Sequence, residues 1–241
     1  MKFNISAFTH IGTKRQINQD RILVNDKILS DGFYSLDNQI SCYCFVADGI
    51  GGGLAGEIAS QSVLEAILKQ SESFQKLNEE VIENGLYSIN NELIAYSGSK
   101  SEYQGTGTTL TGIIALDDAS YVTIQAGDSE MWVLRDGLFF QITESQVFDD
   151  SEQGSPLISY FGGEEAKLEL SLNSSLREIR QHDLIVISSD GLLNALAPKQ
   201  LKAILSNTQA LKEKSEFILN QVLKTGANDN VSCILIEVVN N

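Results

Sequence analysis

The sequence predicts a single α+β domain built on antiparallel β-sheets, and three observations lead to this fold class. The chain has 241 residues, of which 42% are hydrophobic, so it is long enough to bury a sizeable core. It contains only 2 Pro and no linker-like stretch, so we expect residues 1–241 to form one domain. Helical patterns come in consecutive runs instead of alternating with strands, which favours antiparallel sheets over repeated βαβ units.

The first part of the chain predicts strands followed by a pair of helices. Residues 3–8 and 22–28 alternate loosely between apolar and polar, and 42–47 is a short apolar run, which indicates three strands. Residues 54–69 and 75–96 repeat apolar side chains at helical spacing and predict an antiparallel helix pair. The apolar positions of the second helix are Leu77, Val81, Leu86, Ile89, Leu93 and Ile94.

The rest of the chain is predicted to be rich in strands. Turn signals such as Asp136-Gly137 separate its apolar runs, and this dipeptide is a strong hairpin signal. A polar segment over 144–155 predicts a loop, and 211–224 predicts a third helix. The expected strands are 108–116, 121–126, 131–135, 138–143, 167–170, 183–188 and 231–239.

Charge and cysteine content exclude several classes of protein. The 17 basic and 32 acidic residues give a formal net charge of −15, which argues against a nucleic-acid or anionic-membrane partner. No apolar run approaches the roughly 20 residues of a membrane helix, and the N-terminus lacks the apolar stretch of a signal peptide. The three cysteines, Cys42, Cys44 and Cys233, fall in apolar strand-like segments and are expected to be buried and reduced. We therefore expect a soluble, cytoplasmic protein.

Aspartates stand beside or near glycines where the apolar strands end. Asp48-Gly49 follows one strand, Gly127-Asp128 and Asp190-Gly191 follow two others, and Asp229 precedes the last strand. Each alone is most simply explained by turn chemistry. Four such sites at strand ends can converge, and converging carboxylates repel one another unless a cation lies among them. An all-oxygen ligand set favours Mg²⁺, Mn²⁺ or Ca²⁺ over zinc.

A glycine motif offers a competing interpretation. Residues Gly51 to Gly56 satisfy G-x-G-x-x-G, follow a predicted strand and open a predicted helix, as in dinucleotide-binding proteins. Against it, Asp48 would put negative charge beside a pyrophosphate, and another helix follows instead of a parallel strand. A nucleotide-binding module stays a minor alternative.

Taken together, six short motifs resemble the metal-dependent protein phosphatases, the protein phosphatase 2C or PPM family of bacterial type. The resemblance runs nearly end to end and keeps the family order. The motifs are Gly12-Thr13-Lys14-Arg15-Gln16-Ile17-Asn18-Gln19-Asp20, Val46-Ala47-Asp48-Gly49-Ile50-Gly51-Gly52, Gly105-Thr106-Gly107-Thr108-Thr109-Leu110, Gly127-Asp128-Ser129, Ser189-Asp190-Gly191-Leu192 and Asp229-Asn230-Val231-Ser232. The resemblance implies a four-layer α-β-β-α sandwich, in which helix pairs flank two antiparallel sheets.

The resemblance also implies a reaction and a set of site residues. Phosphoserine and phosphothreonine in proteins would be hydrolysed by a metal-activated water, without a phosphoenzyme, using two Mn²⁺ or Mg²⁺ ions and a possible third. For the metals, the resemblance implies that Asp48 bridges two ions, that the Gly49 carbonyl completes one site, that Asp190 and Asp229 hold the other ion, and that Asp128 with Asp190 forms a third site. It implies that Arg15 binds the substrate phosphate. Asp20 would be a nearby supporting carboxylate, and Thr108 and Thr109 would give structural support. Substrates of a Ser/Thr kinase and a monomeric enzyme are the expected context, and a non-catalytic phosphoprotein-binding relative is the alternative.

Four features depart from the family pattern. Ile50 stands where some members carry a histidine proposed as general acid, and Gln19 stands where many have Glu. Glu130 replaces the usual Arg after Gly-Asp-Ser, which reverses the charge near the third site. The flap segment, about 144–161, is short, so substrate selectivity is expected to differ, because such loops shape recognition.

Overall fold

Two six-stranded antiparallel sheets form the centre of the computed structural model, which describes residues 1–51, 55–99, 101–148, 156–163, 168–174 and 179–240. Sheet A has the strand order β11 (Leu138–Gln141), β10 (Glu130–Arg135), β14 (Leu184–Ser188), β15 (Val231–Val239), β1 (Lys2–His10) and β4 (Gly32–Gln39). Sheet B has the order β13 (Ser171–Asn173), β9 (Tyr121–Ala126), β8 (Leu110–Leu116), β5 (Ser41–Ala47), β2 (Arg21–Val24) and β3 (Lys27–Leu29). A small third sheet has the order β12 (Phe161–Gly162), β7 (Gly107–Thr108) and β6 (Gly49–Ile50).

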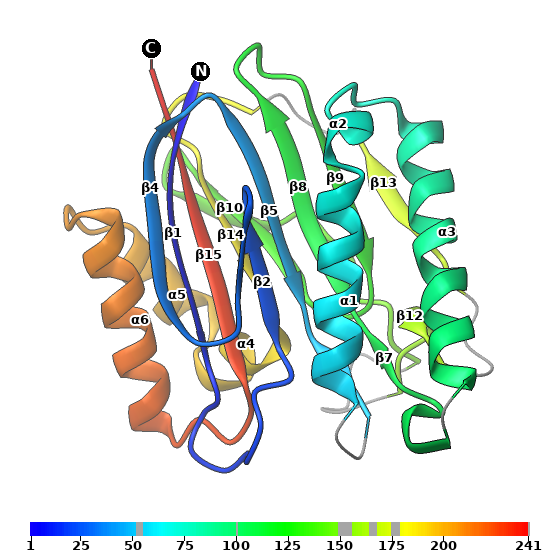
Figure 1. Ribbon diagram of the computed structural model, residues 1–241. Helices are drawn as coiled ribbons and strands as arrows, with labels where there is room; N and C mark the ends of the chain where they lie inside the picture. Colours follow the sequence, from blue (N-terminus) through cyan, green and yellow to red (C-terminus); the bar gives the residue numbers. More distant parts are fainter. Residues whose placement is uncertain (52–54, 100, 149–155, 164–167, 175–178, 241) are drawn as a thin grey trace.

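Helices cover the outer faces of both sheets, which confirms the predicted α-β-β-α order of layers (Figure 1). Sheet B is covered by α1 (Gly56–Lys69), α2 (Ser71–Phe74) and α3 (Glu79–Gly98), with a 3-10 turn at Ser101–Tyr103. Sheet A is covered by α4 (Asp190–Ala195), α5 (Pro198–Leu205) and α6 (Leu211–Thr225). The two chain ends lie side by side because β1 pairs with β15, with Lys2 opposite Val239 (Figure 1).

Strand alternation divides the apolar side chains among three cores. On β5, Cys42, Cys44 and Val46 point between the two sheets, whereas Tyr43 and Phe45 point toward α1 and α3. A third core lies between sheet A and α4–α6. Both faces of each sheet are thus buried, which explains why β5 and β15 consist of nearly unbroken apolar runs. The predicted burial of the reduced cysteines is confirmed, since all three are free and buried.

The first part of the chain differs from the sequence expectation in three elements. Residues 22–28 form a hairpin of β2 and β3 rather than one strand, because Asn25 adopts a positive φ of 55° at the turn. Strand β4 was not predicted, since it is a polar edge strand whose alternate residues face solvent. Helix α3 starts at Glu79, where the Asn78 side chain accepts a hydrogen bond from Val81 N and caps the first turn.

Some expectations about side-chain burial and strand position were wrong. Leu86, Ile89 and Leu93 of α3 are buried as predicted, but Val81 and Ile94 are 42% and 38% exposed. The strand expected over 167–170 is absent at 168–170, and β13 follows at Ser171–Asn173; residue 167 lies outside the described residues.

The later part of the chain differs in its helices and in one interrupted strand. Helices α4 and α5 were not predicted, because each is too short to display a clear helical period. Helix α6 matches its expected range and ends at Gly226, whose φ of 109° is the left-handed conformation that terminates helices. The strand expected over 108–116 is interrupted at Thr109, because its backbone N donates to the Asp48 carbonyl instead of a strand partner.

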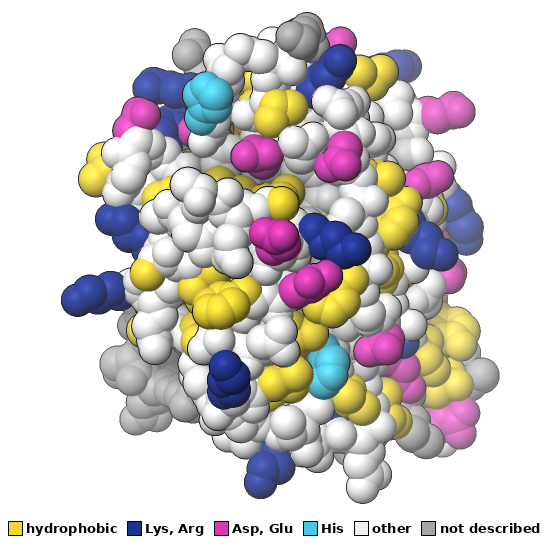
Figure 2. Space-filling model, turned by 90° about the vertical axis from the view of Figure 1, so that its left-hand side faces the viewer, with side chains coloured by type: hydrophobic (Ala, Val, Ile, Leu, Met, Phe, Trp, Pro, Cys, Tyr) yellow, Lys and Arg dark blue, Asp and Glu magenta, His cyan; other side chains and the backbone are white. Residues whose placement is uncertain are grey.

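The outer face over α5 and α6 carries basic and acidic side chains interspersed with one another (Figure 2). On this face, therefore, neither sign of charge forms a continuous patch. Among the described helices, none has the length and apolar character that spanning a membrane requires.

Removing the Phe45 ring is expected to destabilise the fold strongly. The ring is fully buried between sheet B and the helices, so Phe45→Ala should lower the free energy of unfolding by about 3–5 kcal/mol in denaturant titrations. The matched control is Phe148→Ala, which removes the same atoms from a side chain that is 73% exposed and should cost less than about 0.5 kcal/mol. Similar losses for both variants would contradict the assignment of Phe45 to the core.

Candidate metal centre

The four aspartates singled out in the sequence lie at one end of the sandwich. Asp48 follows β5, Asp128 follows β9, Asp190 begins α4 directly after β14, and Asp229 precedes β15. Asp48 interacts electrostatically with each of the other three, and Asp190 interacts with Asp128 and Asp229. The strand ends therefore gather these carboxylates from segments far apart in the sequence.

Asp48 is held in place by its own backbone rather than by its carboxylate. Its N–H donates to Thr109 Oγ1 (3.0 Å), and its carbonyl accepts from Thr109 N and Thr108 Oγ1, both at 2.9 Å. The Thr109 hydroxyl also hydrogen-bonds the hydroxyl of Ser129 at 2.8 Å. Thr108 and Thr109 thus connect Asp48 with Asp128, the neighbour of Ser129, and leave the Asp48 carboxylate available to a ligand.

Asp190 is brought close to Asp229 by a tight backbone contact. A Cβ at Gly191 would lie 2.0 Å from the Asn230 carbonyl oxygen, so a side chain at position 191 would push the two segments apart. Ser189 N donates to Ser232 O at 3.1 Å and continues the β14–β15 pairing up to the aspartates. Glycine after Asp190 is therefore required by packing.

Gly49 meets a similar constraint on the other sheet. A Cβ there would lie 2.3 Å from the Gly56 carbonyl and 2.7 Å from the Gln19 carbonyl. The turn after Asp48 is thus pressed between the start of α1 and the segment that precedes β2. This close approach explains the glycine beside Asp48 without any reference to a nucleotide.

Asp20 is fully buried beneath this group of carboxylates. Its Oδ2 accepts a hydrogen bond from Ser189 Oγ at 2.8 Å, whereas its Oδ1 has no hydrogen-bond partner. A buried carboxylate oxygen without a partner costs free energy, so its presence indicates a group that another ligand or a proton satisfies. Asp20 interacts with both Asp48 and Asp190, and the supporting role expected for it stays a prediction.

Burial and mutual repulsion make these carboxylates hard to ionise. Desolvation raises the pKa of Asp20 and of Asp190 to about 6, and the charges of Asp128 and Asp229 add to the effect on Asp190. Desolvation raises the pKa of Asp48 well above its usual value, with further contributions from Asp20 and Asp190. Divalent cations would reverse these shifts, because positive charge stabilises the ionised form.

Arg15 supplies the positive charge that the structure itself holds at this end. Its Nε and Nη2 each lie 2.7 Å from one carboxylate oxygen of Asp229, so the ion pair is bidentate. The two side chains are 53% and 37% exposed, so water screens the pair. The Asp229 charge raises the pKa of Arg15, with smaller contributions from Asp48 and Asp190.

The residues present fit divalent cations in chemistry, although they do not form a closed cage. The described residues include no group of three or more His, Cys, Asp or Glu side chains arranged to hold one ion. Asp229 is turned toward Arg15, which removes one carboxylate from such a group. The fit lies instead in the all-oxygen donor set, the orphaned oxygen of the buried Asp20, and the repulsion among partly buried carboxylates.

Asp128 and Glu130 form a second acidic pair at the edge of the centre. Burial raises the pKa of Asp128, and the charge of Glu130 raises it further. Burial also raises the pKa of Glu130, whose carboxylate accepts a hydrogen bond from Trp132 Nε1 at 2.6 Å. Glu130, at the position where the family pattern usually has Arg, therefore adds negative charge beside Asp128.

The glycine motif at Gly51–Gly56 lacks the surroundings of a dinucleotide site. Residues 52–54 lie outside the described part of the chain. Helix α1 leads into α2 and α3 rather than into a parallel strand, and every strand pairing among the described residues is antiparallel. The βαβ unit that gives this motif its function is not formed there.

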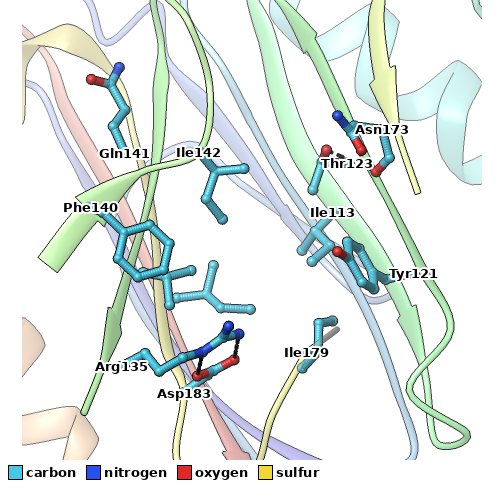
Figure 3. A pocket seen from close by; sticks show the side chains of 12 residues that line it. Ile113, Tyr121, Thr123, Arg135, Phe140, Gln141, Ile142, Asn173, Ile179 and Asp183 are labelled. Carbon is cyan, nitrogen blue, oxygen red and sulfur yellow. Dashed lines mark hydrogen bonds and ion pairs between the residues drawn. The ribbon is translucent and has the colours of Figure 1, made fainter. Parts of the chain in front are cut away.

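A cavity of about 250 Å³ lies between the sheets, away from the aspartates (Figure 3). Its walls include Ile113, Ile142 and Phe140, and the bidentate Arg135–Asp183 ion pair lies at one side. Asp183 precedes β14 and Asp190 follows it, so the cavity and the carboxylates lie at opposite ends of that strand. The cavity is thus not the site that the sequence predicted.

Sequence reasoning assigned no role to Asn230, which organises the loop that carries Arg15. Its side-chain oxygen accepts from Gln19 N at 2.9 Å, and its amide donates to Ile11 O and Ile17 O. The neighbours Asp229 and Asn230 thus act together: Asn230 holds the loop, and Asp229 pairs with Arg15 of that loop. In the sequence, only the position of Asn230 next to Asp229 indicated a role for it.

The chain is similar in sequence to known protein phosphatases. A family model of protein phosphatase 2C matches residues 11–235. The chain is 27% identical over 224 residues to the serine/threonine phosphatase stp of Listeria monocytogenes serotype 4b, covering 85% of this chain and 87% of that protein. It is 25% identical over 252 aligned positions to the protein phosphatase PhpP of Streptococcus pneumoniae D39, covering 97% of both.

Solved structures share the fold. The Streptococcus agalactiae serine/threonine phosphatase superposes with a TM-score of 0.80 at 22% identity, covering 98% of this chain and 99% of that one. The catalytic domain of the serine/threonine protein phosphatase PstP, solved with two manganese ions, superposes with a TM-score of 0.77 at 24% identity, covering 99% and 100%.

The metal-free protein is expected to lose stability as pH rises through the raised pKa of Asp20. A carboxyl whose pKa rises from 3.8 to about 6 on folding stabilises the fold below about pH 4, and this contribution disappears as pH passes 6. The free energy of unfolding should therefore fall less between pH 4.5 and 7.5 in Asp20→Asn than in the wild type, with a difference on the order of 1–3 kcal/mol. Chemical denaturation with chelator present measures both values. The exposed Asp31→Asn serves as control, and equal pH slopes for Asp20→Asn and wild type would contradict the assignment.

Proposed function

Because the chain belongs to the protein phosphatase 2C family, we propose that it hydrolyses phosphoserine and phosphothreonine in proteins at the centre formed by Asp48, Asp128, Asp190 and Asp229. The observation that carries this proposal is the gathering of these partly buried carboxylates, in which Asp48 and Asp190 are repelled by their acidic neighbours, with Arg15 paired to Asp229. The names of the relatives stp and PhpP, both protein phosphatases, support the substrate class.

Two Mn²⁺ or Mg²⁺ ions are the proposed cofactors. Asp48 would contact both ions, with the Gly49 carbonyl completing one site and Asp190 and Asp229 completing the other. The two manganese ions in the PstP structure support this number. A third, weaker ion between Asp128 and Asp190 is part of the proposal, and Glu130 would strengthen its attraction.

Each residue then has a physical task in phosphate ester hydrolysis. Bound divalent ions supply an activated water near neutral pH and offset charge on the phosphoryl oxygens. Arg15 would turn from Asp229 to the substrate phosphate, since its planar fork matches either partner with two parallel hydrogen bonds. Asp20 and its Ser189 contact would hold Asp48 and Asp190 in position from below.

The cellular setting is also a proposal. Three free, buried thiols fit a reducing compartment, so we place the enzyme in the cytoplasm, acting as a monomer. Its substrates would be proteins phosphorylated by a Ser/Thr kinase. Residues 1–241 would act as one catalytic domain.

Activity should require both metal and Asp190. Wild-type protein with Mn²⁺ should hydrolyse a phosphothreonine peptide, and chelation by EDTA should abolish turnover. Asp190→Asn should lower kcat/KM by at least about 100-fold, because one anionic ligand is lost. The exposed Asp31→Asn is the matched control and should retain full activity. Full activity of Asp190→Asn would refute the metal assignment, and Mn²⁺ binding without turnover would favour the non-catalytic relative.

Arg15→Gln should change metal and substrate binding in opposite directions. Without the guanidinium, Asp229 is free to bind metal, so the Kd for Mn²⁺ in calorimetry should fall about 2- to 5-fold, as fits a pair worth less than about 1 kcal/mol. The KM for a phosphopeptide should rise, because a charge-assisted bidentate contact is lost. Weaker Mn²⁺ binding in the variant would show that Arg15 supports the metal site rather than competing with it.

A further inference from the structure

The cavity between the two sheets, of about 250 Å³, interrupts a core that is otherwise closed. Its floor is formed by Ile113 of β8, Val133 of β10 and Ile185 of β14, each no more than 3% exposed. Protein interiors are close-packed, and voids larger than a water molecule are few in any one domain. A space of this volume is therefore larger than ordinary packing leaves open.

The rim of the cavity is less buried than its floor. Tyr121, Phe140 and Ile142 line the rim, and each is partly exposed. Figure 3 shows Phe140 and Ile142 on one side of the space and Ile113 and Tyr121 on the other, and all the lining residues belong to the described part of the chain. A small molecule can thus reach the buried floor from the rim without separating the sheets.

The lining carries no net charge at neutral pH. Its one cation, Arg135, and its one anion, Asp183, form a bidentate pair with N···O distances of 2.6 and 2.5 Å. The two side chains are 14% and 2% exposed, and Asp183 also accepts a hydrogen bond from Arg180 N. A charged ligand would lose its hydration without meeting an unmatched opposite charge, so the lining favours an uncharged molecule.

A hydroxyl group faces the cavity near the end away from the ion pair (Figure 3). Thr123 of β9 points between the sheets, since its neighbours Val122 and Ile124 belong to the core beneath α1 and α3. The Thr123 side chain is 6% exposed, and its hydroxyl donates to the Asn173 carbonyl at 3.2 Å. A hydroxyl oxygen has two lone pairs, so Thr123 Oγ1 can also accept a hydrogen bond from a ligand.

The volume and the apolar walls indicate the size of the ligand. A cavity of about 150 Å³ lined by Leu, Ile and Phe binds benzene in an engineered protein. The cavity between the sheets is larger and is also lined mainly by Ile and Phe, so it fits one ring with a short substituent. Small-molecule sites commonly combine such apolar walls with a few polar groups that fix the orientation of the ligand.

We propose that the cavity between the sheets is a binding site for a small, uncharged ring compound that carries one hydrogen-bond donor. The ring would pack against Ile113, Val133 and Ile185, and the donor would bond to Thr123 Oγ1. The site uses none of the residues proposed for phosphate hydrolysis, and it lies at the other end of β14 from Asp190.

Benzyl alcohol is the probe for the test, because it is an uncharged ring with one hydroxyl group. Selective labelling of isoleucine methyl groups allows NMR to observe the site in the full chain, since four isoleucines line it: Ile113, Ile142, Ile179 and Ile185. Benzyl alcohol should shift these four signals with a Kd on the order of 1 mM or lower. Benzoate and benzylammonium have similar size but carry a charge, so each should bind at least about 10-fold more weakly.

Two variants change the cavity in different ways. Ile142→Trp adds bulk at the partly exposed rim and should weaken benzyl alcohol binding by at least about 10-fold, because it occupies the space of the ring. Its matched control is Ile40→Trp, at a side chain that is 65% exposed and outside the cavity, which should bind as the wild type does. Thr123→Val removes the acceptor and should weaken benzyl alcohol binding about 2- to 10-fold while leaving toluene binding unchanged.

Signals from the other two cores separate binding at this site from general partition into the protein. Ile82 and Ile218 are buried in those cores, and their methyl signals should not move. Equal shifts at these residues, no shift at about 10 mM benzyl alcohol, or binding that Ile142→Trp leaves unchanged would overturn the inference. Benzoate or benzylammonium binding as tight as benzyl alcohol would refute the uncharged class of ligand. None of these measurements depends on turnover, so the result is separate from that of the proposed function.

Discussion

The constraint on which the candidate site depends is the crowding of acidic side chains, one buried and four partly buried, at one end of the sandwich. Asp20 is completely buried, and Asp48, Asp128 and Asp190 all have raised pKa values because desolvation and mutual repulsion oppose their ionisation. In the absence of metal, protons, the partly exposed Arg15, the charge of Arg21 and the hydrogen bond from Ser189 reduce that repulsion. Divalent cations at the proposed centre would relieve it more fully, because positive charge stabilises ionised carboxylates.

The surrounding structure is arranged so that this strain does not spread. Threonine hydroxyls hold the backbone of Asp48, and Asn230 holds the loop of Arg15 through three hydrogen bonds. Gly49 and Gly191 permit contacts that a Cβ would forbid. The aspartates stand at the ends of strands that are packed on both faces, and such closely packed sheets resist being pushed apart by the repulsion between the carboxylates.

The two ends of the sandwich manage buried charge differently. At the cavity end, Asp183 is matched by Arg135 in a bidentate pair and also accepts from Arg180 N, so its charge is satisfied within the chain (Figure 3). At the other end, Arg15 pairs with Asp229 and Arg21 interacts with Asp20, and one oxygen of the buried Asp20 has no hydrogen-bond partner. The contrast supports placing the proposed catalytic centre at one end of β14, with a structural ion pair at the other.

From the sequence by itself it followed that the domain is α+β with antiparallel sheets, that one pair of helices and a third helix are present, and that four aspartates stand at the ends of apolar strands. These features rest on local periodicity and turn chemistry, which are read over a few residues. Local patterns did not predict the polar strand β4, which has few apolar residues, or the helices α4 and α5, which are too short to show a helical period. They also did not predict the turn at Asn25, which divides one expected strand into a hairpin. Only the tertiary structure decided that Arg15 faces Asp229, that Asn230 fixes the loop of Arg15, and that Gln146 ties the flap to Gly127. Such contacts join residues up to 219 positions apart, and no local pattern encodes which distant partner a side chain will meet.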